Sequence, residues 1–191
     1  KFVESEKGRA LLVSEPELAP ILDDHERLRK MPAGSLAHAY CDFMEKEGLS
    51  AAGLIAEYDR FSPRKYGDLI EWYGVRQRDT HDLLHVLTGY GRDALGEQCV
   101  LAFTYGQNPA LGNLFIAYAG GLNMKQQVKS KAPVFKAIRE AQKMGKACPR
   151  INEESITELL AQPLEALRER LHIKTPHHYH EAHRQYHSEN V

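Results

Sequence analysis

Helical periodicity dominates this sequence, and the strand-like alternation of apolar and polar residues is almost absent. The segment 35–48 is a clear example, with an N-capping Ser35, a terminating Gly48 and four apolar residues on one face: Leu36, Ala39, Tyr40 and Phe43. Ser14 followed by Glu17 resembles a capping box and predicts a further helix start at residue 14. We therefore expect an all-α protein, folded as a compact single-domain helical bundle.

The length of the chain, 191 residues, suits one domain. We expect a helical domain over residues 14–174, an N-terminal arm over 1–13 and a His-rich C-terminal tail over 175–191. The tail holds five of the ten histidines. Three of them share one helical face and could bind a stray metal, although a polar, partly ordered arm is the favoured interpretation: His180, His183 and His187.

Charge and cysteine usage narrow the function classes. The 25 basic and 26 acidic residues nearly balance, so we expect no nucleic-acid partner. The three cysteines are far apart and form no CxxC pair, which argues against a zinc ribbon or a disulfide framework and favours reduced thiols. The N-terminus has no run of signal-peptide length, but it does not begin with methionine, so a trimmed targeting segment stays open. The low-charge run 100–124 is interrupted by Gln107, Asn108 and Pro109, and we expect it not to span a bilayer.

Four polar groups with metal-ligand chemistry lie in the stretch 78–100, "RDTHDLLHVLTGYGRDALGEQCV". On a helix that turns about 100° per residue, His81, Asp82 and His85 share one arc, and Arg78 falls inside it. Three leucines occupy the opposite, packing side: Leu83, Leu84 and Leu87.

The glycines after Thr88 predict a helix end, and a second helix from about residue 92 would carry Glu97 back toward His85. Two imidazoles and two carboxylates suit zinc, manganese or ferrous iron better than copper(I) or an iron–sulfur cluster. An isolated pair of histidines at this spacing is more often structural, but the added Asp82 and Glu97 favour a metal site.

Other metal motifs fit less well. HDLLH places Asp where the metalloprotease motif HExxH has its general base, and the shorter side chain argues against peptidase chemistry. A His-Asp phosphohydrolase needs further ligands, for which only His38 and Asp93 are candidates. A di-iron carboxylate bundle needs two ExxH motifs, which the sequence lacks.

The pattern His81-Asp82-x-x-His85, eleven residues and Glu97 resembles the HDxxHx11E signature of the Coq4 family. "PAGSLAHAYCDFM" and "ELLAQPLEALRERLHI" resemble conserved segments of the same family, and the likeness runs from about residue 32 to 182. The resemblance implies an all-helical fold and a divalent metal on these four residues. Zinc comes first by family, with iron, manganese or cobalt as alternatives.

The resemblance also implies a function in ubiquinone (coenzyme Q) biosynthesis. The implied reaction is a metal-dependent C1 oxidative decarboxylation of a polyprenylated hydroxybenzoate, which makes the protein a lyase that replaces a ring carboxyl by a hydroxyl. Implied partners are this or another isoprenoid lipid, a membrane surface, other coenzyme Q biosynthesis proteins and a second copy of the chain in a homodimer. The implied location is peripheral, on the cytoplasmic face of a bacterial inner membrane or the matrix face of the mitochondrial inner membrane. The alternatives are a non-catalytic lipid-binding scaffold and, least favoured, an unrelated metal hydrolase.

An isoprenoid tail requires apolar surface, because each buried methylene contributes about 0.8 kcal/mol. We expect a lipid groove beside the metal, although ordinary core packing is the alternative for each member: Phe103, Leu111, Leu114, Phe115, Gly120, Gly121 and Leu122. Arg78 is the candidate catalytic residue that would pair with the substrate carboxylate, and a salt bridge to Asp79 or Asp82 is the alternative.

Four ligands on tetrahedral zinc would close the site, whereas an octahedral ion keeps two positions open, and we expect the open site. Residues 122–150 hold eight cations and only Glu140 as an acid. They indicate either docking on anionic lipid or a solvated helix face.

Overall fold

The computed structural model describes residues 2–53, 56 and 67–189, and within them the chain forms α-helices, one short 3-10 helix and no strand. A single isolated bridge joins Ser35 and Pro163. The predicted all-α class is confirmed. The contacts group the chain into two compact units: unit 1 is Lys1–Val86 with Ile151–Leu167, and unit 2 is Leu87–Arg150 with Arg168–Val191.

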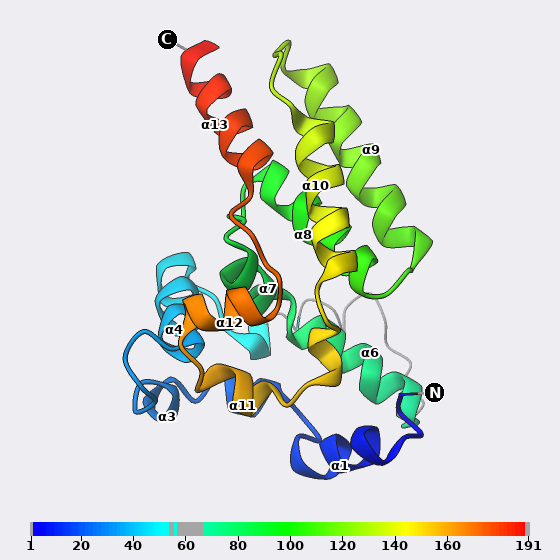
Figure 1. Cartoon of the computed structure of the whole chain (residues 1–191), viewed down its shortest axis with the longest axis vertical. Helices are drawn as coiled ribbons and strands as arrows, with labels where there is room; N and C mark the ends of the chain where they lie inside the picture. The colour runs from blue at the N-terminus through cyan, green and yellow to red at the C-terminus, as the bar shows by residue number, and fades with distance from the viewer. Residues whose placement is uncertain (1, 54–55, 57–66, 190–191) are drawn as a thin grey trace. The chain divides into compact units, whose positions relative to one another are not determined.

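Unit 1 consists mainly of short helices (Figure 1). In chain order they are α1 (Glu6–Ser14), α2 (Ala19–Leu22), α3 (His25–Leu28), α4 (Leu36–Glu47), α6 (Leu69–Asp79), the start of α7 (His81–Thr88), η1 (Ile151–Glu153), α11 (Ile156–Leu160) and the start of α12 (Leu164–Arg170). Helix α4 has the predicted caps. The Ser35 hydroxyl accepts a hydrogen bond from the His38 N–H, and Gly48 adopts the left-handed conformation with φ 66°.

The predicted helix start at Ser14 is wrong. Ser14 is the last residue of α1, whose N-cap is Ser5, and only the one-turn helices α2 and α3 follow within the next 14 residues. Pro16 cannot donate a backbone hydrogen bond within a helix that began at Ser14, whereas Pro20 lies in the first turn of α2, where proline is tolerated. The carboxylate of Glu15 is buried in an ion pair. Helix α1 therefore occupies most of the predicted N-terminal arm.

Unit 2 is built from four longer helices: α8 (Ala94–Gln107), α9 (Leu111–Gln127), α10 (Val134–Ala147) and α13 (His177–Glu189). Helix α10 contacts α8, α9 and α13, and lies beside them in Figure 1. Two glycines allow the close approach of α8 and α10. A Cβ on Gly145 would lie 2.1 Å from the Phe103 carbonyl oxygen, and one on Gly106 would lie 2.6 Å from that of Gln142.

Helix α13 covers most of the predicted C-terminal tail. It packs on the rest of unit 2 through Tyr179 and Ala182, which are both buried. The extent of the predicted helical domain and of its arms stays a prediction. Among the described helices, none is both long enough and apolar enough to cross a bilayer.

Candidate metal centre

Helix α7 presents two imidazoles to one point. The Nε2 atoms of His81 and His85 are 3.3 Å apart, and the His85 side chain is buried while His81 is half-buried. Two nitrogens bound to one tetrahedral ion at about 2.05 Å would themselves be about 3.3 Å apart. This distance suits two ligands on one metal ion, and without an ion it also suits a hydrogen bond between the two rings.

The carboxylate of Glu97 completes the cluster. Each of His81, His85 and Glu97 offers one ligand atom, and these atoms all lie within 4.8 Å of one another. Glu97 is half-buried and also lies 3.6 Å from the Arg92 guanidinium. Two imidazoles and one carboxylate form a donor set that suits zinc or ferrous iron. The three residues therefore form a potential site for a divalent metal ion.

The turn before α8 places Glu97 in that helix. Asp93 is the N-cap, and its carboxylate accepts hydrogen bonds from the Leu95 and Gly96 N–H groups at 3.1 Å each. A Cβ on Gly96 would lie 1.9 Å from the Gly91 carbonyl oxygen, so only glycine fits there. The Tyr179 hydroxyl accepts a hydrogen bond from the Gly91 N–H and donates one to Asp93. Helix α13 thus fixes the start of α8.

Phe43 of helix α4 holds the ring of His85. The two ring centroids are 5.7 Å apart and the planes are inclined by only 16°, which is a stacked arrangement. A ligand ring that is fixed in orientation by its neighbours binds metal more tightly. Helical periodicity places Phe43 on the apolar face of its own helix, but nothing in the sequence indicates which ring it touches.

Asp82 is not a member of the cluster, although its side chain is 94% buried. It belongs to the surroundings of Tyr40, whose pKa is raised first by burial and then by the negative charge of Asp82. Its role as a metal ligand stays a prediction.

Arg78 lies at the end of α6 and makes an ion pair with the adjacent Asp79. The Asp79 Oδ1 atom is 2.7 Å from both Nε and Nη2 of Arg78. Burial raises the pKa of Asp79, and Arg78 opposes that rise in part. This is one of the two salt bridges considered from the sequence, and a catalytic role for Arg78 stays a prediction.

A buried polar network fixes the chain immediately before α7. Arg76 is 1% exposed and its Nη2 lies 2.8 Å from the Glu15 carboxylate, which is 2% exposed. The Arg76 Nε donates to the Asn152 carbonyl oxygen at 2.9 Å, and the Thr80 hydroxyl donates to the Asn152 side-chain oxygen at 2.8 Å. Since Thr80 directly precedes His81, this network sets where the metal helix begins.

The predicted groove residues occupy different environments in unit 2. Phe103 is fully buried, Leu114 is half-buried, and Leu111, Phe115 and Leu122 are exposed. A Cβ on Gly120 would meet the Gln98 side chain, and one on Gly121 would meet Ile138. These residues therefore provide a core position, two close helix contacts and an exposed apolar surface. Their role in binding lipid stays a prediction.

The His-rich tail contains a second potential metal cluster, formed by His177, His178 and Glu181. This cluster is not the set predicted to share one helical face, which was His180, His183 and His187. Of that set, His183 lies 3.2 Å from the Asp93 carboxylate, and the His187 ring bonds to the His183 carbonyl oxygen at 2.9 Å.

The family model for "Coenzyme Q (ubiquinone) biosynthesis protein Coq4" matches residues 1–177. The chain is 28% identical over 172 residues to the mitochondrial ubiquinone biosynthesis protein COQ4 homolog of Bos taurus, covering 89% of this chain and 62% of the relative. It is 33% identical over 100 residues to the COQ4 protein of Yarrowia lipolytica, covering 51% of this chain and 36% of that protein.

A crystal structure from Nostoc punctiforme PCC 73102, named for ubiquinone biosynthesis, superposes with a TM-score of 0.66 at 20% identity, covering 91% of this chain and 78% of the other. That likeness shows a shared fold. The chain spans about 62% of the length of its curated mammalian relatives. Because the family model covers nearly the whole chain, this protein belongs to the Coq4 family.

Proposed function

We propose that this protein acts in ubiquinone biosynthesis as a metal-dependent enzyme that removes the C1 carboxyl of a polyprenylated hydroxybenzoate and leaves a hydroxyl. Membership in the Coq4 family supports the assignment of this protein to ubiquinone biosynthesis. The observation that carries the catalytic part is the 3.3 Å spacing of the His81 and His85 Nε2 atoms, with the Glu97 carboxylate in the same cluster. Three protein donors are the number typical of catalytic zinc, because they leave a coordination position for water or substrate.

A bound divalent ion would act as a Lewis acid on the phenol or carboxylate oxygen of the ring. The protein's own residues would hold this ion and orient its ligands. His81, His85 and Glu97 supply the donor atoms, and Phe43 fixes the plane of the His85 ring. Arg78 would exchange part of its ion pair with Asp79 for one with the substrate carboxylate. With dioxygen as the oxidant and an external two-electron donor such as a reduced flavin or nicotinamide, one oxygen atom would enter the ring hydroxyl, the other would leave as water, and the carboxyl carbon would leave as CO2.

The variant Glu97→Gln tests this proposal, because it keeps the shape of the side chain and removes its charge. We expect the metal affinity to fall by at least the roughly 10–100-fold typical of changes around a metal site. In cells that depend on this protein, the carboxylated prenyl ring should accumulate. The matched control is Glu169→Gln, an exposed carboxylate on α12, which should change neither quantity. Unchanged ring products from a folded Glu97→Gln protein that has lost its metal would contradict the catalytic role.

A lipid-binding scaffold is the second candidate, and the exposed apolar residues of α9 favour it. Leu111 and Phe115 are 76% and 74% exposed, and Leu122 is 51% exposed. On a helix these three positions share one face, as an apolar docking stripe would. Replacing Leu111 and Phe115 by Ser should abolish the association with other coenzyme Q biosynthesis proteins if the scaffold role is correct. It should leave the ring chemistry of a purified enzyme intact if the catalytic role is correct.

Peripheral membrane association belongs to the same proposal, on the matrix face of the mitochondrial inner membrane or the cytoplasmic face of a bacterial one. Its support is the mitochondrial naming of the relatives and the cation-rich region 122–150. Flotation with liposomes at low and high salt tests it, and binding that ignores both salt and anionic lipid would contradict it. The homodimer and the absence of a nucleic-acid partner stay predictions.

A further inference from the structure

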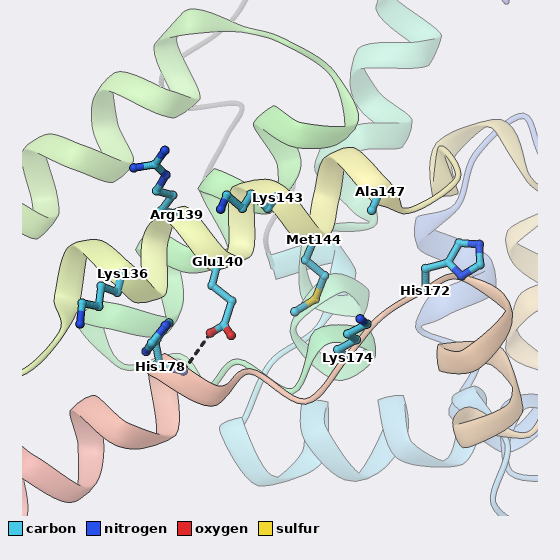
Figure 2. A pocket seen from close by; sticks show the side chains of 9 residues that line it. All are labelled: Lys136, Arg139, Glu140, Lys143, Met144, Ala147, His172, Lys174 and His178. Atoms are coloured by element: carbon cyan, nitrogen blue, oxygen red, sulfur yellow. Dashed lines mark hydrogen bonds between the residues drawn. The ribbon is translucent and has the colours of Figure 1, made fainter.

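A pocket of about 540 Å³ lies within unit 2 and includes none of the three residues of the metal cluster. One wall is helix α10, and the other is the chain that leads from residue 172 into α13 (Figure 2). Four permanently charged cations line it: Lys136, Arg139, Lys143 and Lys174. Glu140 is its only acidic lining residue.

Three of the cations share one helix face because of their spacing. Lys136, Arg139 and Lys143 are three, four and seven residues apart on α10, so they share one face of that helix. Lys174 comes from the opposite wall. Arg139 and Lys143 are also like charges at the i, i+4 spacing, which by itself opposes helix formation. A bound anion would offset that repulsion.

The carboxylate of Glu140 caps the start of helix α13. It accepts a hydrogen bond of 2.9 Å from the His178 N–H at the start of α13, and Figure 2 shows it pointing there. Capping by an acid suits the positive end of a helix. Among the described residues, no ion pair joins a carboxylate to Lys136, Arg139, Lys143 or Lys174, although the charge of Lys136 helps to lower the pKa of the nearby Glu181 carboxyl. The pocket therefore keeps a net positive charge.

We propose that this pocket binds a phosphate monoester or diphosphate group. Such a group carries close to two negative charges or more at neutral pH, whereas a single carboxylate would neutralise only one of the four cations. A guanidinium pairs with two phosphate oxygens at once, and lysines add point charges around it. Met144, which is buried, and Ala147 add an apolar side to the pocket, so an alkyl portion next to the phosphate can also be accommodated. The site is independent of the ring chemistry proposed above.

Calorimetric titration of the full chain with inorganic diphosphate tests the site, in a chelating buffer so that bound metal contributes nothing. Arg139→Gln and Lys143→Gln should each lower the association constant about fivefold, which is about 1 kcal/mol per cation. Lys136→Gln serves as the replacement if either variant fails to fold. The matched control is Lys146→Gln, an exposed lysine on α10 outside the pocket, which should leave binding unchanged. An equal loss in the control would overturn the proposal, because it would reveal only a general charge effect.

Two sources of phosphate are separated by a second measurement. Vesicles of phosphatidylcholine with and without phosphatidic acid are floated with the full chain and with the double variant Arg139→Gln, Lys143→Gln. Pocket-dependent flotation with phosphatidic acid assigns a lipid headgroup to the site. Diphosphate binding without such flotation assigns a soluble phosphate ligand. If neither the binding of diphosphate nor the flotation with phosphatidic acid depends on Arg139 and Lys143, the proposal is wrong.

Discussion

The ion pair between Glu15 and Arg76 gives the most quantitative prediction. Both side chains are almost fully buried, and Glu15 also accepts hydrogen bonds from the Ser155 hydroxyl at 2.7 Å and the Thr157 N–H at 2.9 Å. The variant Glu15→Ala leaves the Arg76 guanidinium buried without its partner. Breaking a buried pair in this way lowers the free energy of unfolding by about 3–5 kcal/mol. For a chain of this length, that corresponds to a fall of roughly 6–20 °C in Tm.

Calorimetry and urea unfolding measure that change. Glu17→Ala is the matched control, because Glu17 is exposed, and it should lie within about 0.5 kcal/mol of the parent. A Glu15→Ala protein as stable as this control would mean that the buried ion pair does not stabilise the fold. The same variant should also weaken metal binding, because Arg76 belongs to the network that fixes Thr80 immediately before His81.

The same pair predicts an acid-labile contribution to stability. Burial by itself raises the pKa of Glu15, but the Thr157 N–H, the Ser155 hydroxyl and the Arg76 charge outweigh it and lower that pKa below the ordinary value of 4.5. A lowered folded-state pKa contributes stability above the unfolded-state value, and this contribution is lost as the pH falls through the folded-state pKa. The stability difference between the parent and Glu15→Ala should therefore shrink below about pH 4.5, and a difference independent of pH down to 2 would contradict this assignment.

Three further changes have definite outcomes. Phe43→Ala removes the stacked support of the His85 ring and should weaken metal binding roughly 10–100-fold in a metal-competition titration, whereas equal affinity would show that the stacking is incidental. Gly96→Ala places a methyl group 1.9 Å from the Gly91 carbonyl oxygen and should lower Tm in calorimetry; an unchanged Tm would contradict the tight turn. Tyr179→Phe removes the hydroxyl shared by the Gly91 N–H and Asp93 and should cost about 1–3 kcal/mol in urea unfolding, so a cost near zero would argue against its role in fixing the start of α8.

Local signals predicted several elements well. The helix from Ser35 to Gly48 was predictable to the residue, because both of its ends are determined by short-range hydrogen bonds and by a left-handed glycine. The packing side of α7 was also predictable from periodicity, since Leu83, Leu84 and Leu87 are all buried. These features depend only on neighbours in sequence.

Features that depend on distant residues were not predictable. Glu15 is buried because Arg76 and Ser155 come to it from 61 and 140 residues away, so the apparent capping box at Ser14 was misleading. The stacking of Phe43 on His85 likewise depends on packing between two helices. Sequence spacing indicated that His81, His85 and Glu97 could meet, and the structure brings their ligand atoms together.

Metal stoichiometry and coordination would show whether His81 and His85 hold a divalent ion together. The chain should first carry His177→Ala and His178→Ala, so that the second potential cluster in α13 cannot bind the ion. We expect about one divalent ion per chain, with two imidazole nitrogens at about 2.0–2.1 Å by X-ray absorption, and we expect this ion to be lost when His85→Ala is added. Binding that persists in the folded His85→Ala protein, or that disappears with the two α13 substitutions alone, would contradict this expectation.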